Sequence, residues 1–199
     1  MVRSIEDQRL SGGKRDLGGL KGTAVWLTGL PASGKTTLAS LLAQEIRRRG
    51  FPVQVLDSDE LRQVLTPQPD YSQREREWFY NSMVFIGRLL ADHGVIVVFA
   101  ATAHRRAFRQ NARLNFPRFF EIYVKCPVEV CMQRDVKGLY QKALSGEITD
   151  LPGVQQPYEE PRSPEIVVNT KNKPPGDCLR ELISGLEGSG LLPEQENCA

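Results

Sequence analysis

Two glycines, a lysine and two threonines follow an apolar run near the N-terminus. Within the stretch GLPASGKTT, Gly29, Gly34, Lys35 and Thr36 satisfy the spacing G-x-x-x-x-G-K-[ST]. Glycines in this pattern let consecutive backbone N–H groups face inward and form an anion nest at a helix N-terminus. Lys35 can then reach the β and γ phosphates of a nucleotide, and the Thr36 hydroxyl can bind Mg²⁺. The pattern predicts ATP and Mg²⁺ as cofactors. The expected ATP contacts are the loop residues Gly29, Ala32, Ser33, Gly34, Lys35, Thr36 and Thr37.

A phosphate loop alone serves GTPases, motors, transporter ATPases and small-molecule kinases. A GTPase would need a base-reading Asn-Lys-x-Asp, and the stretch NTKN at 169–172 lacks the aspartate. A chain of 199 residues is expected to form one domain without a coupling domain. The size therefore favours a small-molecule kinase.

Two carboxylates follow the second apolar run. Asp57 and Asp59 alternate in the stretch LDSDELR, so both can lie near the carboxyl end of a strand that faces the phosphate loop. Phosphoryl transfer to a hydroxyl needs a group that accepts the proton and a group that organises Mg²⁺. We assign these two roles jointly to Asp57 and Asp59, with Lys35 as the third catalytic residue. The alternative is a helix N-cap, supplied by Ser58 or Asp59.

Several arginines come after the carboxylates. Arg62, Arg76, Arg105 and Arg106 could bind an acceptor that is itself a phosphate or sulfate ester, because the guanidinium fork matches such groups. Arg106 is the best placed, since it follows the third predicted strand and strand ends point at the site in such folds. Taken singly, each arginine is more often a solvated surface charge.

Short apolar runs alternate with helical patterns along the chain. Strands are expected at 24–28, 53–56, 95–99, 119–124 and 166–168, and their continuous apolar character is typical of a parallel sheet buried on both faces. Helices are expected after the phosphate loop, over 72–93, after Pro127, and after Asp177 as a cap. The sequence predicts an α/β protein with three α/β/α layers, a mostly parallel five-stranded sheet and a lid.

The chain divides into a core domain and two polar ends. Residues 1–20 are expected to form a flexible arm, 21–187 the P-loop kinase domain, and 188–199 a flexible tail. Residues 135–164 are rich in Gly, Pro and charge without a clear strand, which is typical of a lid or binding loop. The alternative for this segment is a plain surface insertion.

Composition limits the partners. The 26 Lys and Arg residues against 24 Asp and Glu give a formal net charge of +2, which does not favour nucleic-acid binding. The four cysteines form no C-x-x-C pair, so neither a zinc site nor a disulfide framework is expected. No secretory signal and no apolar run long enough to cross a bilayer is present in the sequence. We expect a soluble cytoplasmic protein without membrane contacts.

Several of these stretches together resemble the adenylylsulfate (APS) kinase family over about residues 22–186. The resemblance rests on GLPASGKTT, LDSDELR, Tyr71 and Ser72 with Arg76, PVEVCMQRDVKGLYQKALSGEI, Gly153, and PYEEPRSPEIVVNT, in the same order. It implies transfer of the γ-phosphate of ATP to the 3′-hydroxyl of adenylyl sulfate in sulfate assimilation, and a homodimer. It also implies that Arg134 lies over the ATP adenine. Lid contacts to the acceptor would come from Lys137, Gly138 and Leu139.

Departures from the family pattern fall on the acceptor side. Where the family reads D-G-D-N, this chain has DSDE at 57–60, and the family's acceptor-binding asparagine and arginine align with Phe79 and Asn81. The two phenylalanines that sandwich the acceptor's adenine align with Ala101 and Leu151. Such stacking is worth about 1–3 kcal/mol per ring. The expected acceptor contacts from the main body are Arg62, Arg76, Phe79, Arg106 and Leu151.

Three functions therefore remain open. The first is a divergent APS kinase, and the second is a kinase on the same scaffold with another small hydroxyl compound or nucleotide derivative as acceptor. The third is a regulatory domain that binds nucleotide without catalysis. The intact phosphate loop and carboxylates favour an enzyme.

Overall fold

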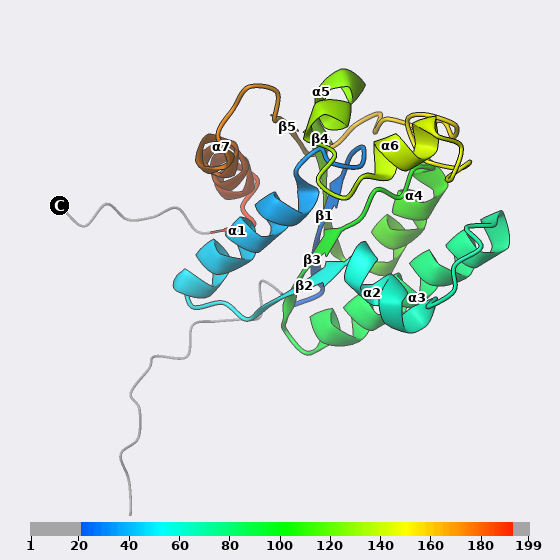
Figure 1. Ribbon diagram of the computed structural model, residues 1–199. Helices are drawn as coiled ribbons and strands as arrows, with labels where there is room; N and C mark the ends of the chain where they lie inside the picture. The colour runs from blue at the N-terminus through cyan, green and yellow to red at the C-terminus, as the bar shows by residue number, and fades with distance from the viewer. Residues whose placement is uncertain (1–20, 193–199) are drawn as a thin grey trace, which may run out of the picture.

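The computed structural model describes residues 21–192, in which strands and helices alternate along the chain (Figure 1). The strands are β1 (Thr23–Thr28), β2 (Val53–Asp57), β3 (Ile96–Ala100), β4 (Arg118–Lys125) and β5 (Ile166–Asn169). The helices are α1 (Lys35–Arg48), α2 (Ser58–Leu65), α3 (Gln73–Asp92), α4 (Arg106–Asn115), α5 (Val128–Arg134), α6 (Leu139–Leu144) and α7 (Pro175–Gly188).

The five strands form one sheet in the order β2-β3-β1-β4-β5, and every pairing is parallel. The predicted α/β class and all five predicted strands are confirmed, with ends that differ by one residue. The sheet is wholly parallel where a mostly parallel one was expected. Because β1 lies in the middle, the loop that follows it opens at the centre of the sheet's carboxyl edge.

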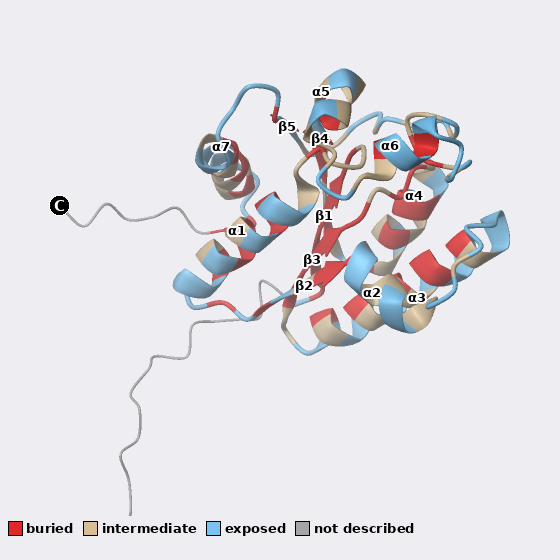
Figure 2. Cartoon of the chain, viewed as in Figure 1, coloured by how far each residue is buried: buried red, intermediate tan, exposed pale blue. Residues whose placement is uncertain are grey.

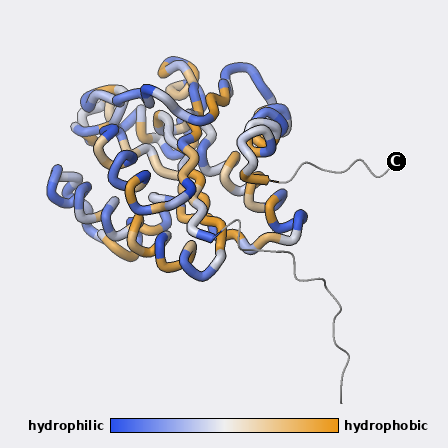
Figure 3. Tube along the Cα trace, turned by 180° about the vertical axis from the view of Figure 1, so that it is seen from behind, coloured by the Kyte–Doolittle hydropathy of each residue, from blue (hydrophilic) through white to orange (hydrophobic). Residues whose placement is uncertain are grey.

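Side chains alternate between the two faces of the sheet, as the pleat of a strand requires. Val25 and Leu27 pack against α1 and α7 on one face. Ala24 and Trp26 pack against α3 and α4 on the other face, where α2 adds Leu61. The central strands β1 and β3 are accordingly buried at every residue between two helical layers, whereas the edge strands β2 and β5 are partly exposed (Figure 2). The apolar chain segments converge on this sheet when the molecule is viewed from behind (Figure 3).

Helix α3 is packed very closely on the sheet. Its N-cap is Ser72, whose hydroxyl accepts a hydrogen bond from Glu75 N, and its first turn therefore has a side-chain cap. A Cβ atom added at Gly87 would lie 2.3 Å from Cζ of Phe99 on β3. Glycine is thus required where α3 crosses the sheet.

The C-terminal helix differs from its prediction in two ways. It starts at Pro175, with Pro174 in the cap position, so Asp177 lies inside the first turn instead of capping it. Beyond the helix, Leu191 and Leu192 are 1% and 2% exposed and belong to the core beside α1 and α7. The first part of the expected flexible tail is therefore packed. The predicted arm at 1–20 and the residues 193–199 lie outside the described part of the chain.

No helix within residues 21–192 combines the length and the apolar character that a membrane span needs.

Candidate active site

The phosphate loop connects β1 to α1 and follows from local backbone demands. Gly34 takes φ +104° immediately before α1, a conformation that favours glycine. A Cβ atom on Gly29 would lie 2.4 Å from the backbone oxygen of Val124, so the loop passes against β4 without room for a side chain. The loop thereby aims the first N–H groups of α1 at the carboxyl edge of the sheet, where an anion is stabilised.

Lys35 extends back over this loop. Its Nζ donates to the backbone oxygens of Gly29 and Leu30 at 3.1 and 2.8 Å. Burial lowers the pKa of Lys35 to about 8, against smaller opposing effects of Asp59 and Asp57. The amine is thus a partly desolvated positive charge at the position where β and γ phosphates are expected.

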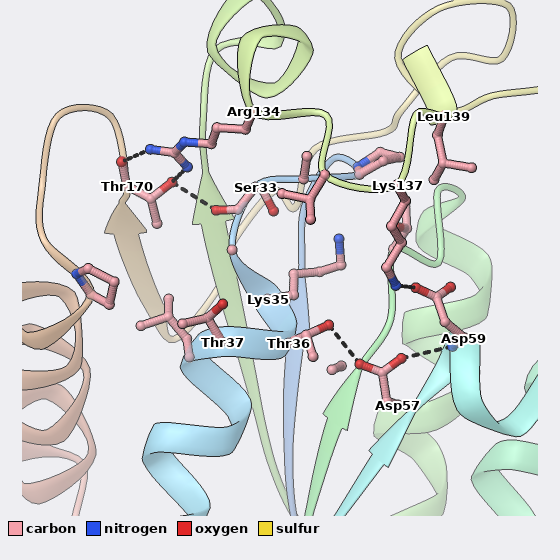
Figure 4. A pocket seen from close by; sticks show the side chains of 18 of the residues that line it. Ser33, Lys35, Thr36, Thr37, Asp57, Asp59, Arg134, Lys137, Leu139 and Thr170 are labelled. Atoms are coloured by element: carbon pink, nitrogen blue, oxygen red, sulfur yellow. Dashed lines mark hydrogen bonds and ion pairs between the residues drawn. The ribbon is translucent and has the colours of Figure 1, made fainter. Parts of the chain in front are cut away.

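Asp57 and Thr36 form the next part of the site. Asp57 is 5% exposed, and its Oδ2 accepts a hydrogen bond of 2.7 Å from the Thr36 hydroxyl (Figure 4). Its other oxygen accepts from Asp59 N at 2.8 Å and caps α2. The N-cap of α2 is therefore Asp57. The alternative considered from the sequence, a cap supplied by Ser58 or Asp59, is not what the structure has. One carboxylate both starts a helix and fixes a threonine of the phosphate loop.

Asp59 faces the segment 135–164, the predicted lid, which is called the lid below. Its Oδ2 lies 2.5 Å from Nζ of Lys137, in the segment between α5 and α6, and both side chains are more than half exposed. This ion pair bridges the carboxyl end of β2 and the lid (Figure 4). Asp57 and Asp59, which the sequence could not separate, thus have different partners and different exposure.

A cavity of about 590 Å³ joins these groups. Most of the predicted donor-side residues line it, together with two of the three predicted lid residues. These are Ala32, Ser33, Gly34, Lys35, Thr36, Thr37, Asp57, Asp59, Arg134, Lys137 and Leu139. The wall also contains residues that sequence reasoning missed, namely Thr102, Val136, Thr170, Lys173, Pro175 and Cys178. Their only signal in the sequence is that each follows a strand or borders a predicted helix.

The far end of the cavity is built around Arg134. Its guanidinium donates to the backbone oxygen of Thr170 at 2.6 Å and to the Thr170 hydroxyl at 3.3 Å. Because β5 ends at the preceding residue, this contact fastens α5 to the edge of the sheet. A flat guanidinium held in this way offers a surface on which an aromatic base can stack.

The acceptor residues predicted from the main body do not line this cavity. Phe79 is 0% exposed and lies in the core, with the guanidinium carbon of Arg62 3.9 Å from its ring centre. Phe79 faces the sheet side of α3 together with Tyr80 and Met83, and its contact with an acceptor stays a prediction. Leu151 is likewise buried in a cluster under the lid.

The three predicted acceptor arginines already have partners. Arg62 pairs with Glu75 at 2.6 Å, and Arg76 pairs with Asp150 of the lid at 2.6 Å. The guanidinium of Arg106 donates to the backbone oxygen of Glu160 at 3.1 Å. Gly138, the third predicted lid residue, does not line the cavity and is the N-cap of α6, with φ +65°. Arg76 and Arg106 thus tie the lid to the main body, and their contact with an acceptor stays a prediction.

The end of the predicted lid is anchored firmly. The Tyr158 hydroxyl lies 2.9 Å from Oγ1 of Thr28, and Glu159 N donates to His104 O at 2.8 Å. The carboxylate of Glu159 also accepts from Arg106 N at 2.7 Å, at the first turn of α4. These contacts hold residues 158 and 159 against the end of β1 and against the segment that leads from β3 into α4.

The arrangement provides what phosphoryl transfer requires: an anion nest, a lysine, a threonine hydroxyl on a buried carboxylate, and a lid cation. Electrostatic stabilisation and positioning are the main contributions to catalysis in this reaction class. The site lies at the carboxyl edge of the sheet, as in other open α/β folds.

Comparison with known proteins gives a consistent family. Residues 21–169 match the family model described as adenylylsulphate kinase. The adenylyl-sulfate kinase of Synechococcus sp. (strain JA-3-3Ab) is 41% identical over 174 residues, which cover 87% of this chain and 99% of that protein. The probable adenylyl-sulfate kinase of Archaeoglobus fulgidus is 44% identical over 147 residues, covering 73% of this chain and 94% of that protein.

Solved structures give the same picture. The APS kinase of Mycobacterium tuberculosis, solved in complex with AMPPNP and APS, is 33% identical with a TM-score of 0.79 and covers 84% of this chain and 98% of its own. A gluconokinase from Sinorhizobium meliloti is 20% identical with a TM-score of 0.59, covers 84% and 93% of the two chains, and shares the fold.

Proposed function

The chain belongs to the adenylylsulfate kinase family, and we propose that it transfers the γ-phosphate of ATP to the 3′-hydroxyl of adenylyl sulfate, which gives PAPS in sulfate assimilation. The observation that carries the proposal is one cavity in which a complete phosphate loop, a buried carboxylate on Thr36 and a lid lysine meet.

The donor side has a clear division of roles. The loop N–H groups and Lys35 would hold the β and γ phosphates of ATP, and Arg134 would lie against the adenine at the far end of the cavity. Because Lys35 is partly desolvated, its attraction for phosphate is stronger than that of a surface lysine.

Transfer itself exchanges two phosphorus–oxygen bonds. The 3′-oxygen bonds to the γ-phosphorus, the bond from that phosphorus to the β–γ bridging oxygen breaks, and the hydroxyl proton passes to a carboxylate. We assign the proton to Asp59, because its side chain is 58% exposed in the cavity and lies on the lid side. Asp57, which is buried and bonded to Thr36, is assigned to the metal side.

The residues beside the loop suit Mg²⁺. The Thr36 hydroxyl and the Asp57 carboxylate are hard oxygen donors, which Mg²⁺ prefers. No three His, Cys, Asp or Glu side chains gather into a metal cluster in residues 21–192, which agrees with an ion held by one carboxylate and the substrate phosphates. Held by the Thr36 hydroxyl and the Asp57 carboxylate, Mg²⁺ would supply positive charge that offsets the negative charge of the phosphates.

Turnover by the full chain tests the function. ADP release is measured with ATP and Mg²⁺ in the presence of APS, other nucleotides or small alcohols, with Lys35→Met as the inactive control. We expect APS to stimulate ADP release far above the other compounds. Strong stimulation by a different acceptor alone would replace APS as the substrate. Binding of ATP without turnover on any compound would make the protein a regulatory nucleotide-binding domain.

Assembly and location are further expectations. The proposed homodimer is supported by Trp78, Phe85 and Leu89, which leave apolar surface exposed along α3. A cytoplasmic location is supported by three free cysteines among the described residues, Cys126, Cys131 and Cys178, because thiols persist in a reducing compartment.

A further inference from the structure

Thr170 contacts both ends of the nucleotide cavity. It follows β5, is 5% exposed, and its Oγ1 donates to the backbone oxygen of Ser33 in the phosphate loop at 2.9 Å (Figure 4). Its own backbone N donates to Lys125 O at 2.9 Å, so its position is fixed by the sheet. We propose that Thr170 is a positioning residue that sets the orientation of the peptide between Ser33 and Gly34 and thereby shapes the phosphate nest.

The geometry of a trans peptide gives this hydrogen bond its effect. The carbonyl and the N–H of one planar trans peptide point in opposite directions. Since Ser33 O points at Thr170, the N–H of Gly34 points away from Thr170, and Gly34 itself lines the cavity. The orientation of a nest donor is therefore fixed from outside the loop.

Gly34 makes such a restraint necessary. Its φ of +104° and the lack of a Cβ allow the 33–34 peptide to rotate at a low steric cost. After a half-turn the carbonyl of Ser33 would face the cavity and repel a phosphate. The Thr170 hydroxyl opposes this rotation, because the carbonyl would lose a buried hydrogen bond.

A threonine hydroxyl suits this position because it both donates and accepts. While Oγ1 donates to Ser33 O, it accepts from Arg134 at 3.3 Å, and the stronger contact of Arg134 goes to the Thr170 backbone oxygen. Loss of the hydroxyl alone should therefore weaken the binding of the phosphates by the loop and leave Arg134 in place at the adenine end of the cavity.

Nucleotide titrations separate the two ends. Thr170→Val removes the hydroxyl and keeps the branched shape, whereas Thr170→Ser keeps the hydroxyl. We expect Thr170→Val to raise the Kd for ATP about three- to tenfold, as for one lost hydrogen bond. The Kd for adenosine, which lacks phosphates, should stay within about twofold, since the Arg134 contact to the backbone oxygen remains. Thr170→Ser should bind both compounds like the unmodified protein.

A second variant covers the risk of a steric effect. A methyl group of Thr170→Val would occupy the place of Oγ1, 2.9 Å from Ser33 O, so Thr170→Ala, which leaves a small gap, is titrated in parallel. Thermal unfolding confirms that each variant is folded before titration. Equal losses of ATP and adenosine affinity, or unchanged ATP affinity in both variants, would overturn the role of Thr170.

The role rests on the proposed function in two respects: the loop binds the phosphates of ATP, and Arg134 lies against its adenine. The titrations contain no acceptor, so their outcome does not depend on which acceptor is used. If the unmodified chain binds ATP but APS gives no turnover, the proposed reaction fails while the test of Thr170 stands.

Discussion

Replacement of Lys35 by methionine is expected to abolish turnover and to raise the free energy of unfolding at pH 7. Burial lowers the pKa of Lys35 from 10.5 to about 8, so the folded protein holds a charge that it solvates less well than the unfolded chain does. A difference of one in pKa corresponds to about 1.4 kcal/mol, and the ionised amine therefore costs up to about 3 kcal/mol of folding free energy.

Part of this cost is offset by contacts that methionine cannot make. The hydrogen bonds to Gly29 O and Leu30 O contribute about 1 kcal/mol each. The net gain for Lys35→Met is then about 1 kcal/mol, which is a rise in Tm of about 2–4 °C for a chain of this size. Turnover should fall at least about 10²-fold, because a charge that stabilises the transferring phosphoryl group is removed.

The stability difference should depend on pH in a defined direction. Below pH 8 the amine is charged in both the folded and the unfolded protein, and the advantage of Lys35→Met is complete. Between pH 8 and 10.5 the folded protein has lost the proton that the unfolded chain still holds, so the unmodified protein gains stability and the difference shrinks. Urea unfolding at several pH values measures this difference.

Lys142→Met is the matched control. Lys142 is about half exposed and pairs only across the surface with Glu147 at 3.2 Å, so its replacement should change the unfolding free energy by less than about 1 kcal/mol. The reasoning is refuted if Lys35→Met is less stable than the unmodified protein at pH 7, or if its advantage does not shrink as the pH rises from 8 to 10.5.

Two further substitutions test the site and its support. Asp57→Asn should lower kcat about 10²-fold or more, with a smaller rise in the KM for ATP, as measured by steady-state kinetics. Its free energy of unfolding should change by less than about 1 kcal/mol, because asparagine still caps α2. A change confined to KM would assign Asp57 to nucleotide binding alone. Gly87→Ala should destabilise the fold by about 1–3 kcal/mol in urea unfolding, since its Cβ would meet Phe99 at 2.3 Å. A more stable Gly87→Ala would show that α3 can move off the sheet, because alanine is the better helix former.

The sheet and the phosphate loop could be predicted because their causes are local. A strand buried on both faces is a continuous apolar run, and the loop needs fixed residue types at fixed spacing. The packing of Leu191 and Leu192 in the core was missed, although an apolar pair within a polar stretch was a visible sign.

Acceptor contacts were harder to predict from the sequence, because the alignment of a position with a family motif does not tell where its side chain points. Phe79 follows the same helical period as Met83 and Gly87, which pack on the sheet, and this period alone places it in the core. The sequence placed Thr170 shortly after a predicted strand but did not indicate its role, because that role depends on the meeting of β5 and the phosphate loop, more than a hundred residues apart.

The anchored residues at the end of the lid have a consequence for how this scaffold can diversify. Tyr158 and Glu159 hold the chain where it re-enters the main body, so the stretch that precedes them has a fixed downstream end. Substitutions within the preceding stretch leave the contacts of Tyr158 with Thr28 and of Glu159 with Arg106 in place. The same stretch also contacts the phosphate loop, because the Tyr140 hydroxyl donates to the backbone oxygen of Pro31 at 3.0 Å, so a change of acceptor through this stretch has to keep that contact.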